Sequence, residues 1–322
     1  MRVWNAMVRA GAAFDHWVRT PVDPRPIAWF RAWFGLLCLV NIGLLWQDMP
    51  MWLGVDGVLP PEPHGVLCRD AFAGYFTIGV YQIVGYGDPG LTLVRCLAVA
   101  GGLGLLVGVC PRAAAFCTWL AAVSYAWRNP EILHSGDHLV RIGAFFLVFA
   151  RSDRAFSLSH WLRRRSGTAD DEAAASVPAW PQRILQLQLC VLYLAAGILK
   201  ASGRTWRDGT AVGIVLQLGE FERFPIPDWM VCPAGSLVLT YGTILFELGF
   251  PLLVWVPRLR LPVLVAGLVF HAGLDWVMNV QLFQWLITSY YILFLDPKPR
   301  REPDPVGLAE PIAVLHQGVK AV

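Results

Sequence analysis

The chain has 322 residues, of which 56% are hydrophobic and only 15% are charged, and its formal net charge is +3. Soluble domains contain about 25% charged residues, so this composition excludes an ordinary soluble domain and predicts a membrane protein. The apolar runs extend almost from end to end, which predicts one polytopic, all-α transmembrane domain. No segment has the pattern of a nucleic-acid-binding module, and we expect no nucleic-acid partner.

Residues 1–26 have the pattern of an amphipathic helix that lies in the membrane interface. The apolar positions of this helix are Val3, Trp4, Met7, Val8, Phe14, Trp17 and Val18. Arg2, Arg9 and Asp15 lie between them, and no signal-peptidase cleavage motif follows. We therefore expect an interfacial helix and not a cleavable signal peptide.

Eight segments are long and apolar enough to cross, or nearly cross, about 30 Å of hydrocarbon. They are residues 27–46, 91–109, 113–127, 137–150, 184–200, 237–255, 261–278 and 282–295. The third, fourth and eighth are shorter than about 17 residues, so neighbouring helices must bury them or flanking residues must extend them. Glycines of the second segment predict close helix packing. The predicted organisation is a bundle of about eight spans over residues 27–295, followed by a short cytoplasmic tail at 296–322.

The distribution of Lys and Arg predicts the orientation of the bundle. With a cytoplasmic N-terminus, 17 of the 26 cations lie in cytoplasmic segments and 5 lie on the opposite side. This asymmetry predicts that both termini are cytoplasmic, in a bacterial inner membrane or a plasma membrane. It also places Lys200 at the outer end of its span.

Ionisable side chains inside spans are costly, and each marks a functional site or a structural pair. They are Arg31, Arg95, Asp137, His138, Arg141, Lys200, Glu247, His271 and Asp275. The predicted topology brings most of them to the outer half of the membrane. His271 and Asp275 are four residues apart, so they share a helix face and could form a His–carboxylate pair. In the structural interpretation, the three arginines snorkel or pair with Asp137, Glu247 and Asp275.

Two weaker patterns concern metal binding and a disulfide. His134, Asp137 and His138 could supply some of the three or four ligands that a metal site needs, but we expect no metal. Cys68 and Cys232 lie in two long predicted outer loops, where an oxidising exterior could join them. The loops span residues 47–90 and 201–235.

The segment around Lys200 is the most informative part of the chain. An apolar helix ends with Ala196 and Gly197, meets Lys200, and passes into a polar turn that contains Trp206 and Gly209. An ammonium at the edge of so apolar a run either snorkels to the interface or is held beside a pocket for its chemistry.

These residues resemble the catalytic lysine segment of vitamin K-dependent γ-carboxylase and of its bacterial relatives that share the HTTM transmembrane domain. In this chain the interval from lysine to tryptophan is one residue longer. Three further stretches resemble the same family in the same order: Phe30-Arg31 with Phe34-Gly35, Asp137-His138 with Gly143, and Met278 to Phe283. In the second of these, Asp137 replaces an asparagine.

The resemblance implies a base and a helper. Lys200 would act as a neutral amine that deprotonates reduced vitamin K or menaquinone, and His138 would orient the quinone oxygen, with O2 and CO2 as further reactants. The remaining residues that we expect at the quinone pocket are Asp137, Arg141, Trp206, His271, Asp275 and Asn279.

Two functions stay open. Carboxylases of this family continue into a large β-rich domain, whereas 27 residues follow from Asp296 here. The first function is a quinone-dependent carboxylase or oxygenase that acts on a peptide or lipid at the outer face. The second is a non-catalytic membrane accessory protein for maturation or export of a secreted antimicrobial peptide, with a secreted peptide or a redox protein as partner.

Overall fold

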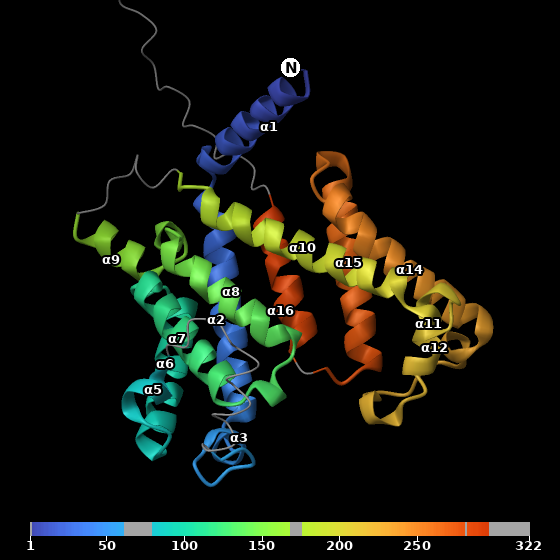
Figure 1. Cartoon of the computed structure of the whole chain (residues 1–322). Coiled ribbons are helices and arrows are strands. Elements are labelled where there is room, and N and C mark those ends of the chain that lie inside the picture. Colours follow the sequence, from blue (N-terminus) through green and yellow to red (C-terminus); the bar gives the residue numbers. More distant parts are fainter. Residues whose placement is uncertain (1, 61–78, 168–175, 281, 296–322) are drawn as a thin grey trace, which may run out of the picture.

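The computed structural model describes residues 2–60, 79–167, 176–280 and 282–295, and every regular element in these ranges is helical (Figure 1). The prediction of an all-α fold is therefore confirmed for this part of the chain. The long helices are α1 (Arg2–Arg19), α2 (Pro24–Leu45), α6 (Asp88–Val107), α7 (Pro111–Arg128), α8 (Ser135–Phe149), α10 (Trp180–Ser202), α14 (Pro233–Leu253) and α15 (Pro257–Val277). The last segment consists of α16 (Phe283–Ser289) and the 3-10 helix η5 (Tyr290–Phe294).

Short helices occupy the connections between the long ones. They are α3 (Met49–Leu53), α5 (Val80–Val84), η1 (Pro130–Ile132), η2 (Ser152–Arg154), α9 (Leu158–Arg165), α11 (Arg204–Arg207), α12 (Ala211–Val215), η4 (Gly219–Phe221) and α13 (Asp228–Val231). Many of the long helices begin with proline in the first turn, where its missing N–H leaves no helical bond unmade. The sequence therefore sets where these helices begin.

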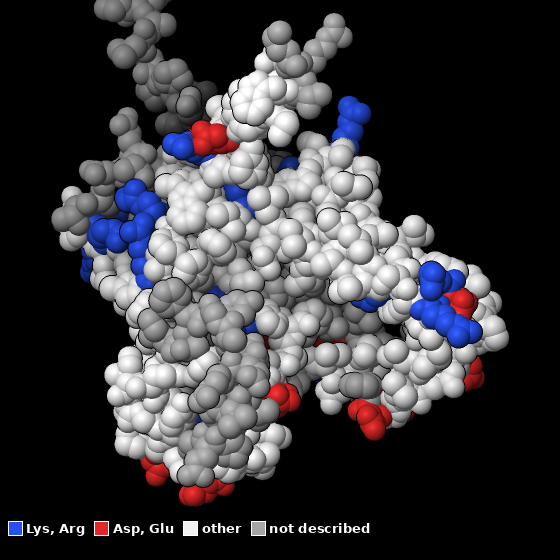
Figure 2. Space-filling view, in the orientation of Figure 1, with Lys and Arg blue, Asp and Glu red and all other residues white. Residues whose placement is uncertain are grey.

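Five helices are long and apolar enough to cross a membrane: α2, α6, α10, α14 and α15. The other three predicted spans are helical at the expected places, but they are shorter or more polar. The total of eight spans remains a prediction. The face of the molecule in Figure 2 is largely uncharged, as expected for a surface that meets lipid.

Glycines allow close packing of the helices in the first half of the bundle, α2 to α8. Gly35 of α2 lies against the backbone of α6 at Gly102, and Gly101 of α6 lies against α7 at Thr118. A methyl group at any of these glycines would collide with the neighbouring helix, so the helices approach closely. The expected close packing of the α6 glycines is confirmed for Gly101 and Gly102.

The short eighth segment occupies the centre of the bundle, between α8 and α15 in Figure 1. Its Tyr290 is fully buried and donates a hydrogen bond to the carbonyl of Leu139 at 2.7 Å. Gln182 and Gln186 of α10 both donate to the carbonyl of Leu293, at 2.8 and 2.7 Å. Burial among neighbours, one of the two options for this segment, is what the structure shows.

The loops gather at two ends of the bundle. At one end, Val22 and Val177 exchange backbone hydrogen bonds of 2.9 Å, which joins the segment after α1 to the segment before α10. At the other end, Glu222 forms a bridge with Met278. Each bridge joins two segments that the predicted topology places on the same side of the membrane. The cytoplasmic side of the bundle and the interfacial position of α1 remain predictions.

Candidate functional site

Lys200 lies in the last turn of α10 and forms an ion pair with Glu247 of α14. The ammonium nitrogen lies 2.7 Å from Oε1 and 2.9 Å from Oε2 of the carboxylate. The side chain of Lys200 is 27% exposed, whereas that of Glu247 is only 8% exposed. A carboxylate buried this deeply needs a cationic partner, and Lys200 supplies it from the helix end.

The two helices approach closely at Gly197, one turn before Lys200. A Cβ at Gly197 would meet the side chains of Leu248 and Glu247. Because residues three and four apart share a helix face, this glycine brings Lys200 and Glu247 within reach of each other. The Ala-Gly pattern before the lysine thus has a packing role.

Trp206 lies over Lys200, as the turn after α10 brings it back towards the helix. The lysine nitrogen lies 5.4 Å from the centre of the Trp206 ring, a cation–π distance. Gly209 ends this turn with a φ of 74°, in the left-handed region that favours glycine. The hydroxyl of Tyr241 donates to the carbonyl of Arg207 at 2.6 Å and holds the turn against α14.

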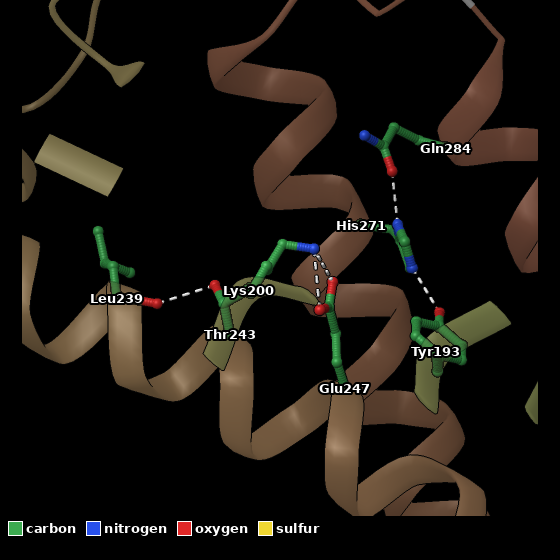
Figure 3. A network of polar contacts seen from close by, with 7 residues as sticks. All are labelled: Tyr193, Lys200, Leu239, Thr243, Glu247, His271 and Gln284. Atoms are coloured by element: carbon green, nitrogen blue, oxygen red, sulfur yellow. Dashed lines mark hydrogen bonds and ion pairs between the residues drawn. The ribbon is translucent and has the colours of Figure 1, made fainter. Parts of the chain in front are cut away.

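A second polar group lies deeper in the same half of the bundle (Figure 3). His271 of α15 contacts Tyr193 of α10 through Nε2 and Gln284 of α16 through Nδ1, each at 2.5 Å. The hydroxyl of Tyr193 also contacts that of Tyr291 at 2.5 Å. All four side chains are buried, and they join α10, α15, α16 and η5.

The donors of this network follow from its acceptors. An amide oxygen of Gln284 only accepts, so Nδ1 of His271 carries the proton and Nε2 of the neutral ring accepts from Tyr193. Tyr193 then accepts from Tyr291. The hydroxyls therefore point in one direction, towards His271.

One pairing that helix spacing permits inside the membrane is not formed. Asp275 does not pair with His271; its Oδ1 lies 2.8 Å from Nη1 of Arg223, in the loop before α14. Shared helix spacing was not sufficient, because His271 faces the core while Asp275 lies near the helix end beside that loop.

The three membrane arginines also find other partners than the expected carboxylates. Arg31 donates to the carbonyls of Ser152 and Phe156, at 3.2 and 2.5 Å. Arg95 donates to the carbonyl of Trp46 at 2.6 Å, and Nη2 of Arg141 lies 2.7 Å from Nδ1 of His138. Among the described residues, the polar partners of these guanidinium groups are backbone carbonyls and a neighbouring imidazole.

His138 and Asp137 occupy the first turn of α8. Asp137 accepts from the N–H of His134 at 2.9 Å, and His134 accepts from Gly136, so Asp137 serves a capping box. Among the residues described, no hydrogen bond or ion pair joins His138 to Lys200. Asn279, also expected at the pocket, is exposed after the end of α15.

One cavity lies between α2, α6, α7 and α8, and Lys200 does not line it. Its wall is mostly apolar, with Asn41, Thr118, Tyr125 and Asp137 as polar members. Within the described ranges, no three His, Cys, Asp or Glu side chains come together as a metal site would require. Cys68 lies outside the described residues, so its disulfide with Cys232 stays a prediction.

The structure therefore assembles Lys200, Trp206 and Glu247, and it places His138 with Arg141 as a separate pair. Sequence reasoning missed Tyr193, Gln284 and Tyr291. The one available signal was that Tyr193 lies seven residues before Lys200, which puts both on one face of α10.

These features define a membrane protein that is helical throughout its described ranges, with a lysine at the end of one span paired to a buried carboxylate. The HTTM domain family matches residues 70–298, which is more than half of the chain. The chain belongs to this family. No solved structure matches it.

Proposed function

We propose that this HTTM protein is a membrane enzyme in which the Lys200–Glu247 pair accepts a proton from a lipid-soluble hydroquinone. The observation that carries the proposal is the placement of the pair. The carboxylate is buried while the amine, beneath Trp206, remains partly exposed. Partial exposure lets a hydroxyl from outside the bundle reach the amine.

The pair can become a base by an internal proton shift. An ammonium cannot accept a proton, but transfer of one proton from Lys200 to Glu247 leaves a neutral amine and a neutral acid. An apolar site favours this neutral form over separated charges. The amine of Lys200 then takes the proton of a hydroxyl that arrives at its exposed side.

The surroundings of Lys200 fit a hydroquinone that arrives through the bilayer. Leu199 and Leu245, on the two helices of the pair, are each 71% exposed, so the site borders a lipid-facing surface. The Trp206 ring offers a flat apolar face beside the amine. When bound, reduced vitamin K or menaquinone would supply the acidic hydroxyl and the electrons for O2, with CO2 as co-reactant in the carboxylase form of the reaction.

The decisive experiment compares Lys200→Arg with the wild type in membranes that contain reduced menaquinone or vitamin K and O2. Arginine keeps the positive charge and the partnership with Glu247, but it cannot become a neutral base. We expect wild type to form the quinone epoxide and the variant to lose about 100-fold or more in rate. Arg204→Gln, one turn further along and exposed, is the matched control.

Absence of epoxide from wild type with every quinone tried would refute the enzyme proposal. Equal rates for wild type and Lys200→Arg would refute the role of Lys200.

A non-catalytic accessory role in maturation or export of a secreted antimicrobial peptide is the second candidate. The observation that favours it is the separation of Lys200 from the cavity beside Asp137 and from His138. On this proposal, Lys200→Met with Glu247→Met would keep peptide secretion at the level of wild type. The enzyme proposal expects the same double variant to form no quinone epoxide.

A further inference from the structure

We propose that three hydroxyl side chains of α14 are positioning residues that hold a cap over the amine of Lys200. The cap segment, residues 203–213, carries Trp206 and begins at Gly203, whose N–H donates to the carbonyl of Lys200 at 2.9 Å. The hydroxyl groups are those of Ser236, Thr240 and Tyr241. This inference rests on the proposed function, because it concerns how substrate and water reach the base.

Buried hydrogen bonds join the cap segment to α14, which lies beside α12 in Figure 1. Oγ of Ser236 donates to the carbonyl of Gly209 at 3.1 Å and accepts from the N–H of Gly213 at 3.0 Å. The N–H of Val212 donates to Oγ1 of Thr240 at 3.1 Å. Ser236 is only 6% exposed and Thr240 is fully buried, so water competes little for these bonds and they hold the segment firmly.

Glycines let the cap segment lie directly against these hydroxyl groups. A Cβ at Gly213 would collide with the side chain of Ser236, and one at Gly209 would press on the ring of Tyr241. The hydroxyl of Tyr241 in turn donates to the carbonyl of Arg207 at 2.6 Å. The segment is therefore attached to α14 on both sides of Gly209.

The face of α14 that holds the cap segment also carries the carboxylate of the base pair. Ser236 and Thr240 are four residues apart, and Glu247 follows Thr240 after seven more, which are spacings of one helix face. One rigid helix thus sets both the position of the cap segment and the position of the partner of Lys200.

The cap segment determines from which side the amine can be reached. A lysine at the end of a membrane helix extends its ammonium to the interface, where water hydrates it. Here the Trp206 ring lies 5.4 Å from Nζ of Lys200 and keeps the amine on Glu247. Leu199 and Leu245, each 71% exposed, leave the lipid-facing side open. We infer that the clamped cap limits the access of water and leaves the route of a lipid-soluble hydroquinone free.

The test measures how fast Lys200 is acetylated by water-soluble sulfosuccinimidyl acetate in the full chain, reconstituted in lipid nanodiscs and read by peptide mass spectrometry. We expect Thr240→Val, which removes the acceptor for Val212 at nearly constant shape, to raise the rate about three- to tenfold. Tyr241→Phe should act in the same direction. Thr240→Ser keeps the hydroxyl and should restore the rate of wild type. Thr288→Val is the matched control, because that hydroxyl bonds to carbonyls of its own helix.

Three labelling outcomes would overturn the proposal. They are an unchanged rate in both Thr240→Val and Tyr241→Phe, a rate in Thr240→Ser as high as that in Thr240→Val, and an equal rise in Thr288→Val. Hydrogen exchange of wild type needs no variant. The N–H groups of Val212 and Gly213 should exchange about tenfold or more slowly than in an unstructured peptide, and unprotected exchange at both would also overturn the proposal.

The epoxide assay of the proposed function separates the two failures. If wild type forms no epoxide, the proposed function fails, while the labelling rates still decide whether the hydroxyl groups hold the cap. If wild type forms epoxide, Thr240→Val should lower kcat by about threefold or more and Thr240→Ser should restore it. An equal kcat in wild type and Thr240→Val would refute the positioning role.

Discussion

Buried cations in the first half of the bundle (α2 to α8) and Lys200 in the second half (α10 to η5) bind different kinds of partner. In the first half, buried cations bind backbone carbonyls: Arg31 those of Ser152 and Phe156, and Arg128 those of Leu53 and Gly54. In the second half, titratable side chains bind one another, as in Lys200 with Glu247. A carbonyl cannot take up a proton at physiological pH, whereas a carboxylate or an imidazole can. The difference agrees with a structural role for Arg31 and Arg128 and with the proton transfer that we propose for Lys200 and Glu247.

The largest expected effect concerns Arg31. Arg31→Met would leave two buried carbonyls without their charged donors, and we expect a loss of about 3 kcal/mol or more in unfolding free energy. Activity per folded molecule should stay unchanged. Denaturant unfolding in detergent measures the loss in unfolding free energy. Arg19→Met, at an exposed position, is the control. A stable but inactive variant would contradict the structural role.

The ion pair should show strong coupling. Lys200→Met leaves Glu247 buried and unpaired, at a cost of about 3 kcal/mol, while the double change with Glu247→Met should recover most of it. A double-mutant cycle should therefore give a coupling energy of about 0.5–3 kcal/mol. Additive single effects would mean that the two side chains do not interact in the membrane.

The direction of the Tyr–His network predicts unequal effects for two similar substitutions. Tyr193→Phe removes the donor to His271 and leaves a buried acceptor unsatisfied, so we expect a loss of about 1–3 kcal/mol. Tyr291→Phe removes only the donor to Tyr193, whose own donation to His271 persists, so its loss should be smaller. Thermal unfolding of both variants checks the order, and the reverse order would exclude the assigned hydrogen positions.

The turn over Lys200 should show the smallest effect. Gly209→Ala puts a Cβ on a left-handed residue and should cost about 1–2 kcal/mol. Gly273, which lies in α15 and where an added Cβ would meet no neighbouring atom within 4 Å, provides the opposite control. Gly273→Ala should stabilise by about 0.5–1 kcal/mol, because alanine is the better helix former. A matching loss at both glycines would show that φ is not the cause.

The sequence by itself determined the helical class, the approximate place of each long helix and the HTTM family. Apolar run length reports burial in lipid, and proline and glycine mark helix starts and turns, so these features are local. The turn from Lys200 to Gly209 was predictable for the same reason, because its geometry depends on residues close together in the chain.

The partners of the ionisable side chains were decided only by the tertiary structure. The spacing of His271 and Asp275 showed that they share a helix face, but not which helices or loops that face meets. The orientation of α15 in the bundle brings His271 into contact with Tyr193 and Asp275 into contact with Arg223. The close approach of α10 and α14 at Gly197 likewise makes Glu247 the partner of Lys200. A single helix specifies its own periodicity, whereas contacts between helices depend on packing across the whole bundle.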